Sequence, residues 1–196
     1  MDTLVRQVRR VGDFPFPHQL AFFLDNPIHK WFINPGEVVE HLALGGDERV
    51  LEIGPGPGVF SLEIARRLTS GRLDLFDVQP QMLAKVKRKL DDAGYRNADF
   101  HSGDASAGLP FPDNTFDVAF LASVLGEVPD RAACIRSLRQ VLKPGGRLVF
   151  EEIFLDPDRL SVADLRALAE PEGFELVSTN GSRWRDIVEF VRTDAA

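Results

Sequence analysis

Apolar and polar positions along the chain follow two repeating patterns. Short apolar runs with β-branched and aromatic members predict buried strands, and apolar positions spaced three or four apart predict helices. The predicted strands lie at 49–53, 73–77, 97–103, 116–122 and 147–153. The predicted helices between them lie at 59–69, 80–93 and 130–141. Because strands and helices alternate, the pattern predicts an α/β fold built on an open sheet with parallel strands.

The C-terminal part of the chain shows a different order of elements. A helix is predicted at 161–169, where Ser161 and Asp164 resemble a capping box with Asp in the usual Glu place. Two strands follow at 174–179 and 187–191, joined by a predicted turn around Asn180-Gly181. These two strands are expected to form an antiparallel pair.

Residues 1–48 precede the first strand and are dense in aromatic side chains. Two Asn-Pro pairs, in which Asn can cap a helix and Pro can begin it, help to predict short helices at 18–24, 27–32 and 35–43. We expect a helical lid segment, residues 1–48, across the mouth of the sheet, and one domain from residue 49 to residue 196. The alternative is that the aromatic side chains only pack this segment onto the domain.

The stretch RVLEIGPGPG, residues 49–58, combines a strand with a tight glycine-rich turn. Its glycines, Gly54, Gly56 and Gly58, depart from the G-x-G-x-x-G spacing of dinucleotide-binding loops. The two prolines between them have no N–H, so the loop is poor in the donors that a phosphate needs. Glu52, inside the apolar strand, would repel phosphate and favour a cation or an ammonium group. In an open α/β sheet, ligands bind beyond the carboxyl ends of such strands.

Composition excludes several classes of function. The formal net charge of −7 argues against a general nucleic-acid binder, and the apolar runs are too short for a membrane span. A basic N-terminus without a following apolar region does not predict a secretory signal, so a cytoplasmic protein is expected. The single cysteine, Cys134, argues against an internal disulfide and a cysteine-rich metal site, and no His/Asp cluster with ligand spacing predicts a metal. The oligomeric state is left open.

Two segments resemble a known family. E-I-G-P-G-P-G after a strand is similar to the first motif of class I S-adenosylmethionine (SAM) dependent methyltransferases. The segment FDVAFLASVLGEVPD…LKPGGRLVF resembles the later motifs of the type 11 methyltransferase family. The resemblance covers roughly residues 49–154. It implies a Rossmann-like, seven-stranded, mostly parallel sheet of order 3-2-1-4-5-7-6, with helices on both faces.

The resemblance also implies a SAM site at the carboxyl ends of the strands. In such a site Asp77 accepts hydrogen bonds from the ribose hydroxyls, Asp104 meets the adenine amine, and the Ala105 N–H points at the ring. The residues expected to bind the cofactor are Glu52, Gly54, Gly56, Gly58, Asp77, Val78, Asp104, Ala105 and Ser123. Simpler interpretations remain open, namely that Glu52 faces water, that Asp77 only ends its strand and that Asp104 only forms a turn.

Glu127, with Ser123 as a hydrogen-bonding helper, is the candidate base if the methyl acceptor must lose a proton. Many relatives carry His pairs near the end of the fourth strand, where this chain has Gly126-Glu127. Glu127 could equally face solvent or cap a neighbouring helix. The expected function is methyl transfer to a small-molecule acceptor, and an apolar or aromatic acceptor is favoured. The alternatives are a non-catalytic SAM-binding regulatory module and a nicotinamide-dependent oxidoreductase.

Overall fold

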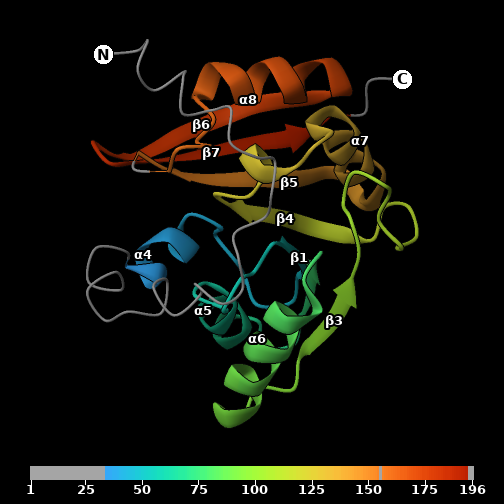
Figure 1. Ribbon diagram of the computed structural model, residues 1–196, viewed down its shortest axis with the longest axis vertical. Helices are drawn as coiled ribbons and strands as arrows, with labels where there is room; N and C mark the ends of the chain where they lie inside the picture. The colour runs from blue at the N-terminus through green and yellow to red at the C-terminus, as the bar shows by residue number, and fades with distance from the viewer. Residues whose placement is uncertain (1–33, 155, 194–196) are drawn as a thin grey trace.

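Seven strands form one sheet in the order β3-β2-β1-β4-β5-β7-β6 (Figure 1). The structure is a computed structural model that describes residues 34–154 and 156–193. The strands are β1 (Arg49–Ile53), β2 (Arg72–Asp77), β3 (Ala98–Ser102), β4 (Phe116–Ala122), β5 (Leu142–Ile153), β6 (Phe174–Ser182) and β7 (Arg185–Arg192). Strands β1 to β5 pair in parallel, and β7 pairs antiparallel with both β5 and β6. The implied strand order and the antiparallel final pair are therefore confirmed.

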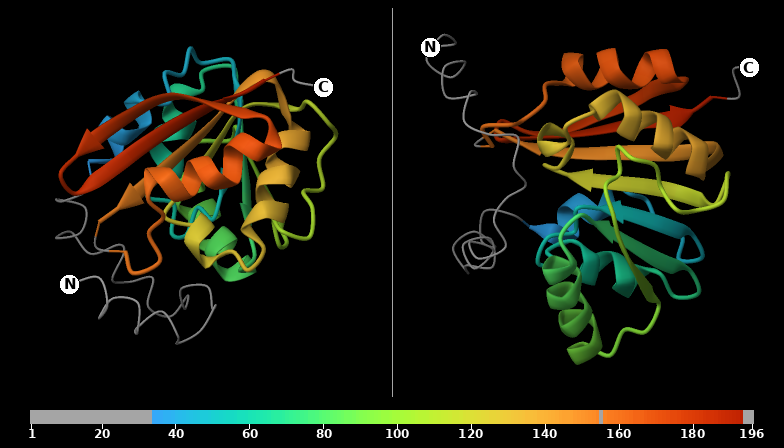
Figure 2. Two further views of the ribbon diagram at one scale, coloured as in Figure 1. Left: turned by 90° about the horizontal axis from the view of Figure 1, so that it is seen from above. Right: turned by 45° about the vertical axis from the view of Figure 1, so that its right-hand side comes forward.

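Helices cover both faces of this sheet (Figure 2). One face packs on α4 (Pro35–Glu40), α5 (Ser61–Arg67) and α6 (Pro80–Asp92), and the other packs on α7 (Arg131–Val141) and α8 (Val162–Ala169). Two short 3-10 helices, η2 (Leu125–Glu127) and η3 (Glu170–Glu172), complete the described elements. Strand side chains alternate between the two faces, so the sheet carries two apolar clusters, one beneath each helix layer.

Side-chain caps fix where three of the helices begin. Asn34 accepts a hydrogen bond from the Glu37 amide at the start of α4, and Asp130 accepts one from the Ala133 amide at the start of α7. At α8, the Ser161 side chain and the Asp164 side chain each bond the other residue's amide, so the predicted capping box is present.

The described part of the N-terminal segment packs on the domain core. Val38, Val39 and Leu42 are fully buried in the same apolar cluster as Val50 of β1. The predicted helices at 18–24 and 27–32 lie outside the described residues. The lid across the sheet therefore stays a prediction.

Two predicted boundaries in the C-terminal half are wrong. Strand β5 begins at Leu142 rather than Arg147, because Leu142 pairs with Phe116 and residues 143–146 form an irregularity within the strand. The hairpin turn lies at residues 183–184 rather than 180–181, because β6 continues to Ser182. Gly181 pairs with Asp186, and a Cβ on Gly181 would lie 2.2 Å from the Arg185 carbonyl oxygen. That glycine allows a close approach of two strands instead of forming the turn.

The parallel strands place their carboxyl ends along one edge of the sheet, which we call the carboxyl edge. The residues that directly follow β1, β2, β4 and β5 there are Gly54, Val78, Ser123 and Phe154. The hairpin turn between β6 and β7 reaches the same edge, because Arg185 at the start of β7 pairs with Ile153 at the end of β5. This edge is where an open α/β sheet binds ligands.

Candidate cofactor and acceptor site

The glycine-rich loop after β1 requires glycine for two different reasons. Gly54, Gly56 and Gly58 all have positive φ, at 63°, 51° and 76°, which L side chains rarely adopt. A Cβ on Gly54 would lie 2.5 Å from Val124 Cγ2, and one on Gly58 would lie 2.4 Å from Val86 Cγ2. At Gly56 a Cβ would meet nothing within 4 Å. The loop is thus packed against the protein at its two ends and open in the middle.

Lys89 of α6 forms hydrogen bonds to the backbone of this loop. Its Nζ donates hydrogen bonds to the carbonyl oxygens of Pro57 at 2.9 Å and Gly58 at 3.2 Å. The Lys89 ammonium group thus bonds to carbonyls that the tight turn leaves facing α6.

Glu52 is a buried carboxylate behind the loop. Its side chain is 2 % exposed, and its Oε2 atom has no hydrogen-bond partner among the described residues. The pKa of Glu52 is raised to about 7, mainly by burial and also by the charge of Asp77, while Ser61 and Lys89 oppose this rise. The interpretation in which Glu52 faces water is therefore wrong. A buried, unpaired carboxylate oxygen is costly unless a ligand supplies a donor or a positive charge.

Asp77 ends β2 and reaches back to the glycine loop. It is 6 % exposed, its Oδ1 accepts a hydrogen bond from the Gln79 amide at 2.8 Å, and the Gly56 amide also bonds to it. Burial raises the pKa of Asp77, and these two amides lower it. One of the few N–H groups of the loop is thus already used by a carboxylate. Val78, which follows, is exposed at the carboxyl edge.

Asp104 and Ala105 lie just after β3, where Asp104 is exposed and Ala105 is buried. The exposed Asp104 accepts hydrogen bonds from the Ser106 amide at 2.8 Å and the Ser106 hydroxyl at 2.7 Å, so it does form a turn. Ala105 is buried in the apolar cluster beneath α7 and α8. Their contacts with an adenine ring remain a prediction.

Ser123 and Glu127 lie beyond β4, next to the glycine loop. Ser123 has φ +52°, and its amide donates a hydrogen bond to the Glu151 carbonyl oxygen at 2.8 Å. Glu127 is half-buried in η2. Between them Gly126 packs so closely that an added Cβ would lie 2.1 Å from the Asp158 carbonyl oxygen. The backbone here is shaped by its neighbours, and both predicted side chains lie at the carboxyl edge.

Two buried glutamates at the end of β5 were missed. Glu151 and Glu152 are 2 % and 1 % exposed. Glu151 Oε1 lies 2.9 Å from Arg185 Nε, and Glu152 Oε2 accepts a hydrogen bond from the Leu160 amide at 3.1 Å. Burial raises the pKa of Glu151 to about 7 and that of Glu152 to about 8. The available signal was the pair of carboxylates inside the apolar run LVFEEIF, the same kind of signal that singled out Glu52.

The structure brings most of the predicted residues to one edge but separates them by strand. Glu52, the glycine loop and Asp77 lie together on β1 and β2, Asp104 lies one strand further out, and Ser123 and Glu127 lie on the other side at β4. His101 of β3 contacts the buried Asp74 and the ring of Phe111, so it belongs to a structural network. No group of three or more metal-binding side chains occurs in residues 34–154 and 156–193.

The loop and Glu52 suit SAM better than a pyrophosphate. SAM carries an ammonium group, a sulfonium group and a ribose, and it has no phosphate. The open side of Gly56 leaves room for a ligand to approach the backbone, and the unpaired Glu52 oxygen lies behind the same loop. The prolines and the Gly56–Asp77 bond leave few amides for phosphate oxygens. The residues present therefore fit the cofactor that the resemblance implies.

Comparisons with known proteins agree with this geometry. A family model described as "Methyltransferase domain" matches residues 50–146. The "Ubiquinone/menaquinone biosynthesis C-methyltransferase UbiE" of Enterobacter sp. (strain 638) is 32% identical over 150 residues, which are 74% of this chain and 59% of that protein. The protein of the same name from Pasteurella multocida (strain Pm70) is 33% identical over 153 residues, 76% of this chain and 57% of that protein. The chain thus spans less than two thirds of the length of these curated relatives.

Solved structures match over most of the chain. A SAM dependent methyltransferase from Aquifex aeolicus superimposes with a TM-score of 0.83 at 21% identity, covering 90% of this chain and 99% of that one. The structure titled "[4+2]-Cyclase SpnF" superimposes with a TM-score of 0.72, also at 21% identity, covering 82% and 80%. At these identities the likeness shows the fold, and the second title shows that the fold alone does not determine the reaction. Among the described residues no helix is both long and apolar enough to cross a bilayer.

Proposed function

Because the chain belongs to the class I SAM-dependent methyltransferases, we propose that it transfers a methyl group from SAM to a small acceptor molecule. The observation that carries this proposal is the carboxyl edge of β1. A glycine loop that is open at Gly56 and poor in phosphate donors lies there beside a Glu52 carboxylate oxygen that has no hydrogen-bond partner in the described part of the chain.

The residues of β1 to β3 would hold the cofactor. The loop from Gly54 to Gly58 would pass along it, Asp77 would accept hydrogen bonds from the ribose hydroxyls, and Asp104 would meet the adenine. When bound, SAM supplies a methyl group that its sulfonium already activates. The protein therefore contributes mainly the proximity and orientation of the acceptor.

The acceptor would lie over β4 and β5, on the other side of the glycine loop. Ser123 and Glu127 lie beyond β4 beside this region, and the rings of Phe154 and Trp184, each 57 % exposed, lie at its outer end with their centroids 5.9 Å apart. Exposed rings at a ligand edge suit an apolar or aromatic acceptor. The names of the curated relatives, which methylate carbon in quinone biosynthesis, favour the same class.

Calorimetric titration tests the cofactor. We expect SAM and S-adenosylhomocysteine to bind to the purified protein and NADH not to bind, because the loop lacks pyrophosphate donors. Failure of both sulfur compounds to bind would overturn the proposed function. Tight binding of NADH would favour an oxidoreductase instead.

A turnover assay separates an enzyme from a non-catalytic SAM-binding module. The probe is 1,4-naphthohydroquinone, kept reduced in the absence of oxygen, with mass detection of the methylated product. Methylation supports a small aromatic acceptor. SAM binding without methylation of this probe would count against that acceptor class and favour the regulatory module.

A further inference from the structure

Glu151 lies at the same level of the sheet as the glycine loop. Ile53 pairs with Leu121, Leu121 pairs with Phe150, and Gly54 and Glu151 each follow one residue later. Because neighbouring strands are about 4.8 Å apart, Glu151 lies about 10 Å from Gly54 along the carboxyl edge. That is the span between a cofactor held at β1 and an acceptor held at β5.

The Glu151 side chain also points to the same face of the sheet as Glu52. Val50 and Val149 both belong to the apolar cluster beneath α4, α5 and α6. Glu52 and Glu151 each lie two residues further along the same strands, and side chains two apart share a face. Two buried carboxylates thus lie on one face, one behind the cofactor loop and one beyond β4.

A single arginine pairs with Glu151 from the hairpin. Arg185 Nε lies 2.9 Å from Glu151 Oε1, and the Arg185 side chain is only 12% exposed. Arg185 directly follows Trp184, whose carbonyl oxygen accepts a hydrogen bond from the Phe154 amide at 2.8 Å. The Glu151–Arg185 pair therefore lies at the same end of β5 and β7 as the two exposed rings, near where an aromatic acceptor would enter.

We propose that Glu151 is the base that removes the acceptor's proton, and that Arg185 is the positioning residue that holds its carboxylate. The proposal rests on the proposed function and replaces Glu127 in the role of base. The proton of an acceptor hydroxyl passes to a Glu151 oxygen, and the electron pair left on that hydroxyl oxygen forms the new bond to the methyl carbon. The pair of the broken sulfur–carbon bond stays on sulfur, and Glu151 returns its proton to solvent.

The surroundings of Glu151 suit a base at neutral pH better than those of Glu127. The pKa of Glu151 is raised to about 7, mainly by burial and also by Asp156, while Arg185 opposes this rise. Glu152, on the other face, is the neighbouring carboxyl group. Its pKa is raised by burial and by the charges of Asp156 and Glu151, and lowered by that of Arg159. A base works best when its pKa lies near the working pH. Glu127 is half-buried in η2.

The first test follows the carboxyl group without any cofactor. Protein labelled with carbon-13 at the glutamate carboxyls is titrated by NMR, and the Glu151 signal is assigned as the one missing in E151Q. We expect this signal to titrate near pH 7, and to move when 1,4-naphthohydroquinone is added. R185K, which keeps the charge but not the guanidinium, should shift its titration midpoint, and this shift assigns the signal even if E151Q fails to fold.

The second test measures kcat/KM for the same probe as a function of pH. In the wild type it should rise up to about pH 7 and then level off, because the base must be unprotonated. E151Q should lose about 100-fold or more of kcat and lose this rise, with the SAM dissociation constant unchanged. E189Q is the matched control, because Glu189 also pairs with an arginine, Arg147, but on β7 away from the carboxyl edge. It should behave like the wild type.

Three outcomes would overturn the inference, and they differ from failure of the proposed function. If the Glu151 signal titrates at the pH of ordinary carboxyl groups, Glu151 is not the base. If the Glu151 signal does not move when 1,4-naphthohydroquinone is added, Glu151 lies outside the acceptor site. Full activity of E151Q, with the loss seen in E127Q instead, would return the role to Glu127. Absence of SAM binding in the wild type, by contrast, would overturn the proposed function itself.

Discussion

Buried carboxylates are the most informative single residues of this protein. Glu52, Glu151 and Glu152 all lie near the carboxyl ends of their strands, and burial raises the pKa of each. Buried acids with raised pKa values destabilise the folded state at neutral pH, so stability does not account for their burial, and such groups are typical of functional sites. Glu52 shows this most clearly, since one of its oxygens has no hydrogen-bond partner among the described residues.

We predict that E52Q changes how stability depends on pH. The ordinary pKa of a glutamate is 4.5, and that of Glu52 in the folded protein is about 7. Between these values the unfolded chain is ionised while the folded protein keeps its proton, so stability falls as pH rises, by about 3 kcal/mol in full. Glutamine does not ionise, so E52Q lacks this pH-dependent contribution to the free energy of unfolding. The free energy of unfolding of E52Q relative to wild type should therefore increase by roughly 2–3 kcal/mol from pH 5 to pH 8.

Urea unfolding of both proteins at pH 5, 6, 7 and 8 measures this difference. The constant effect of replacing a carboxyl by an amide cancels, because only the change with pH is compared. If the difference between the two proteins does not vary with pH, Glu52 has an ordinary pKa in the folded state.

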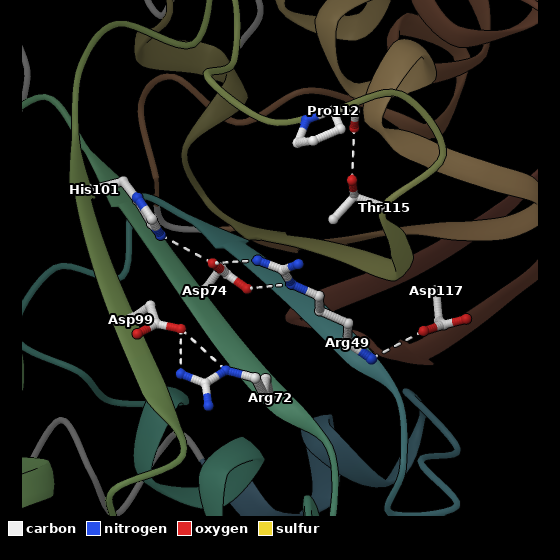
Figure 3. A network of polar contacts seen from close by, with 8 residues as sticks. All are labelled: Arg49, Arg72, Asp74, Asp99, His101, Pro112, Thr115 and Asp117. Atoms are coloured by element: carbon white, nitrogen blue, oxygen red, sulfur yellow. Dashed lines mark hydrogen bonds and ion pairs between the residues drawn. The ribbon is translucent and has the colours of Figure 1, made fainter.

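At the scale of elements, a polar network joins β1, β2 and β3 away from the carboxyl edge (Figure 3). The fully buried Asp74 of β2 accepts two hydrogen bonds from Arg49 of β1, at 2.8 and 3.1 Å, and lies 2.9 Å from His101 Nε2 of β3. Arg49 also donates its amide hydrogen to Asp117 of β4 at 2.9 Å. The network ties together the three strands that carry the predicted cofactor residues.

We predict that D74N costs more stability than D99N. Both aspartates pair with an arginine on a neighbouring strand, but Asp74 is fully buried, whereas the Arg72–Asp99 pair has side chains 52% and 43% exposed. Loss of the buried charge leaves Arg49 without its main partner and should cost about 2 kcal/mol. The exposed pair should contribute less than about 1 kcal/mol.

Denaturant unfolding at pH 7 measures the loss of stability in each variant. The two losses can be compared directly, because both variants replace Asp by Asn on adjacent strands. Equal losses would mean that the buried network contributes no more than a surface ion pair. The SAM affinity of D99N provides a further check, because Asp99 lies far from the carboxyl edge and its loss should leave the site intact.

At the scale of the whole molecule, the strand order separates two tasks. The predicted cofactor residues follow β1, β2 and β3, and the predicted acceptor residues follow β4 and β5, so the sheet divides the carboxyl edge at the glycine loop. Such a division places the reacting centre near β1 and β4, where Gly54 packs on Val124.

We predict that SAM affinity depends on the first group and not on the second. D77A should weaken SAM binding by roughly 1–3 kcal/mol, because the ribose hydroxyls lose a carboxylate partner. E127Q should leave SAM affinity unchanged, since Glu127 lies on the acceptor side. Calorimetry with folded variants measures both. Unchanged affinity in D77A would exclude Asp77 as the ribose ligand, and weakened affinity in E127Q would contradict the division of the edge.

Much of the fold and half of the site could be predicted from local patterns. Periodicity located the strands and helices, and the caps at Asn34, Asp130 and Ser161 were readable because a cap bonds within three residues. The glycine loop and Glu52 were recognisable because a strand, a tight turn and a helix are contiguous in sequence. The two prolines of the loop then argued against a phosphate ligand without any knowledge of the tertiary structure.

Long-range contacts account for what was missed. Glu151 acquires its burial and its partner only when β7 brings Arg185 beside β5, and Lys89 reaches the loop only because α6 packs beneath it. Gly181 looked like a turn residue, yet the fold uses it where two strands approach closely. Each of these roles is decided by a neighbour distant in the chain, which no local pattern contains.

The amino-acid sequence by itself determined the α/β class and the chemistry of the cofactor loop, because both depend on residues adjacent in the chain. Its motifs also implied the strand order, through resemblance. Only the tertiary structure decided which carboxylates are buried, which of them are paired, and that Glu52 and Glu151 share one face at the same edge. Burial and pairing set the protonation of a carboxyl group, and both arise from packing between distant segments.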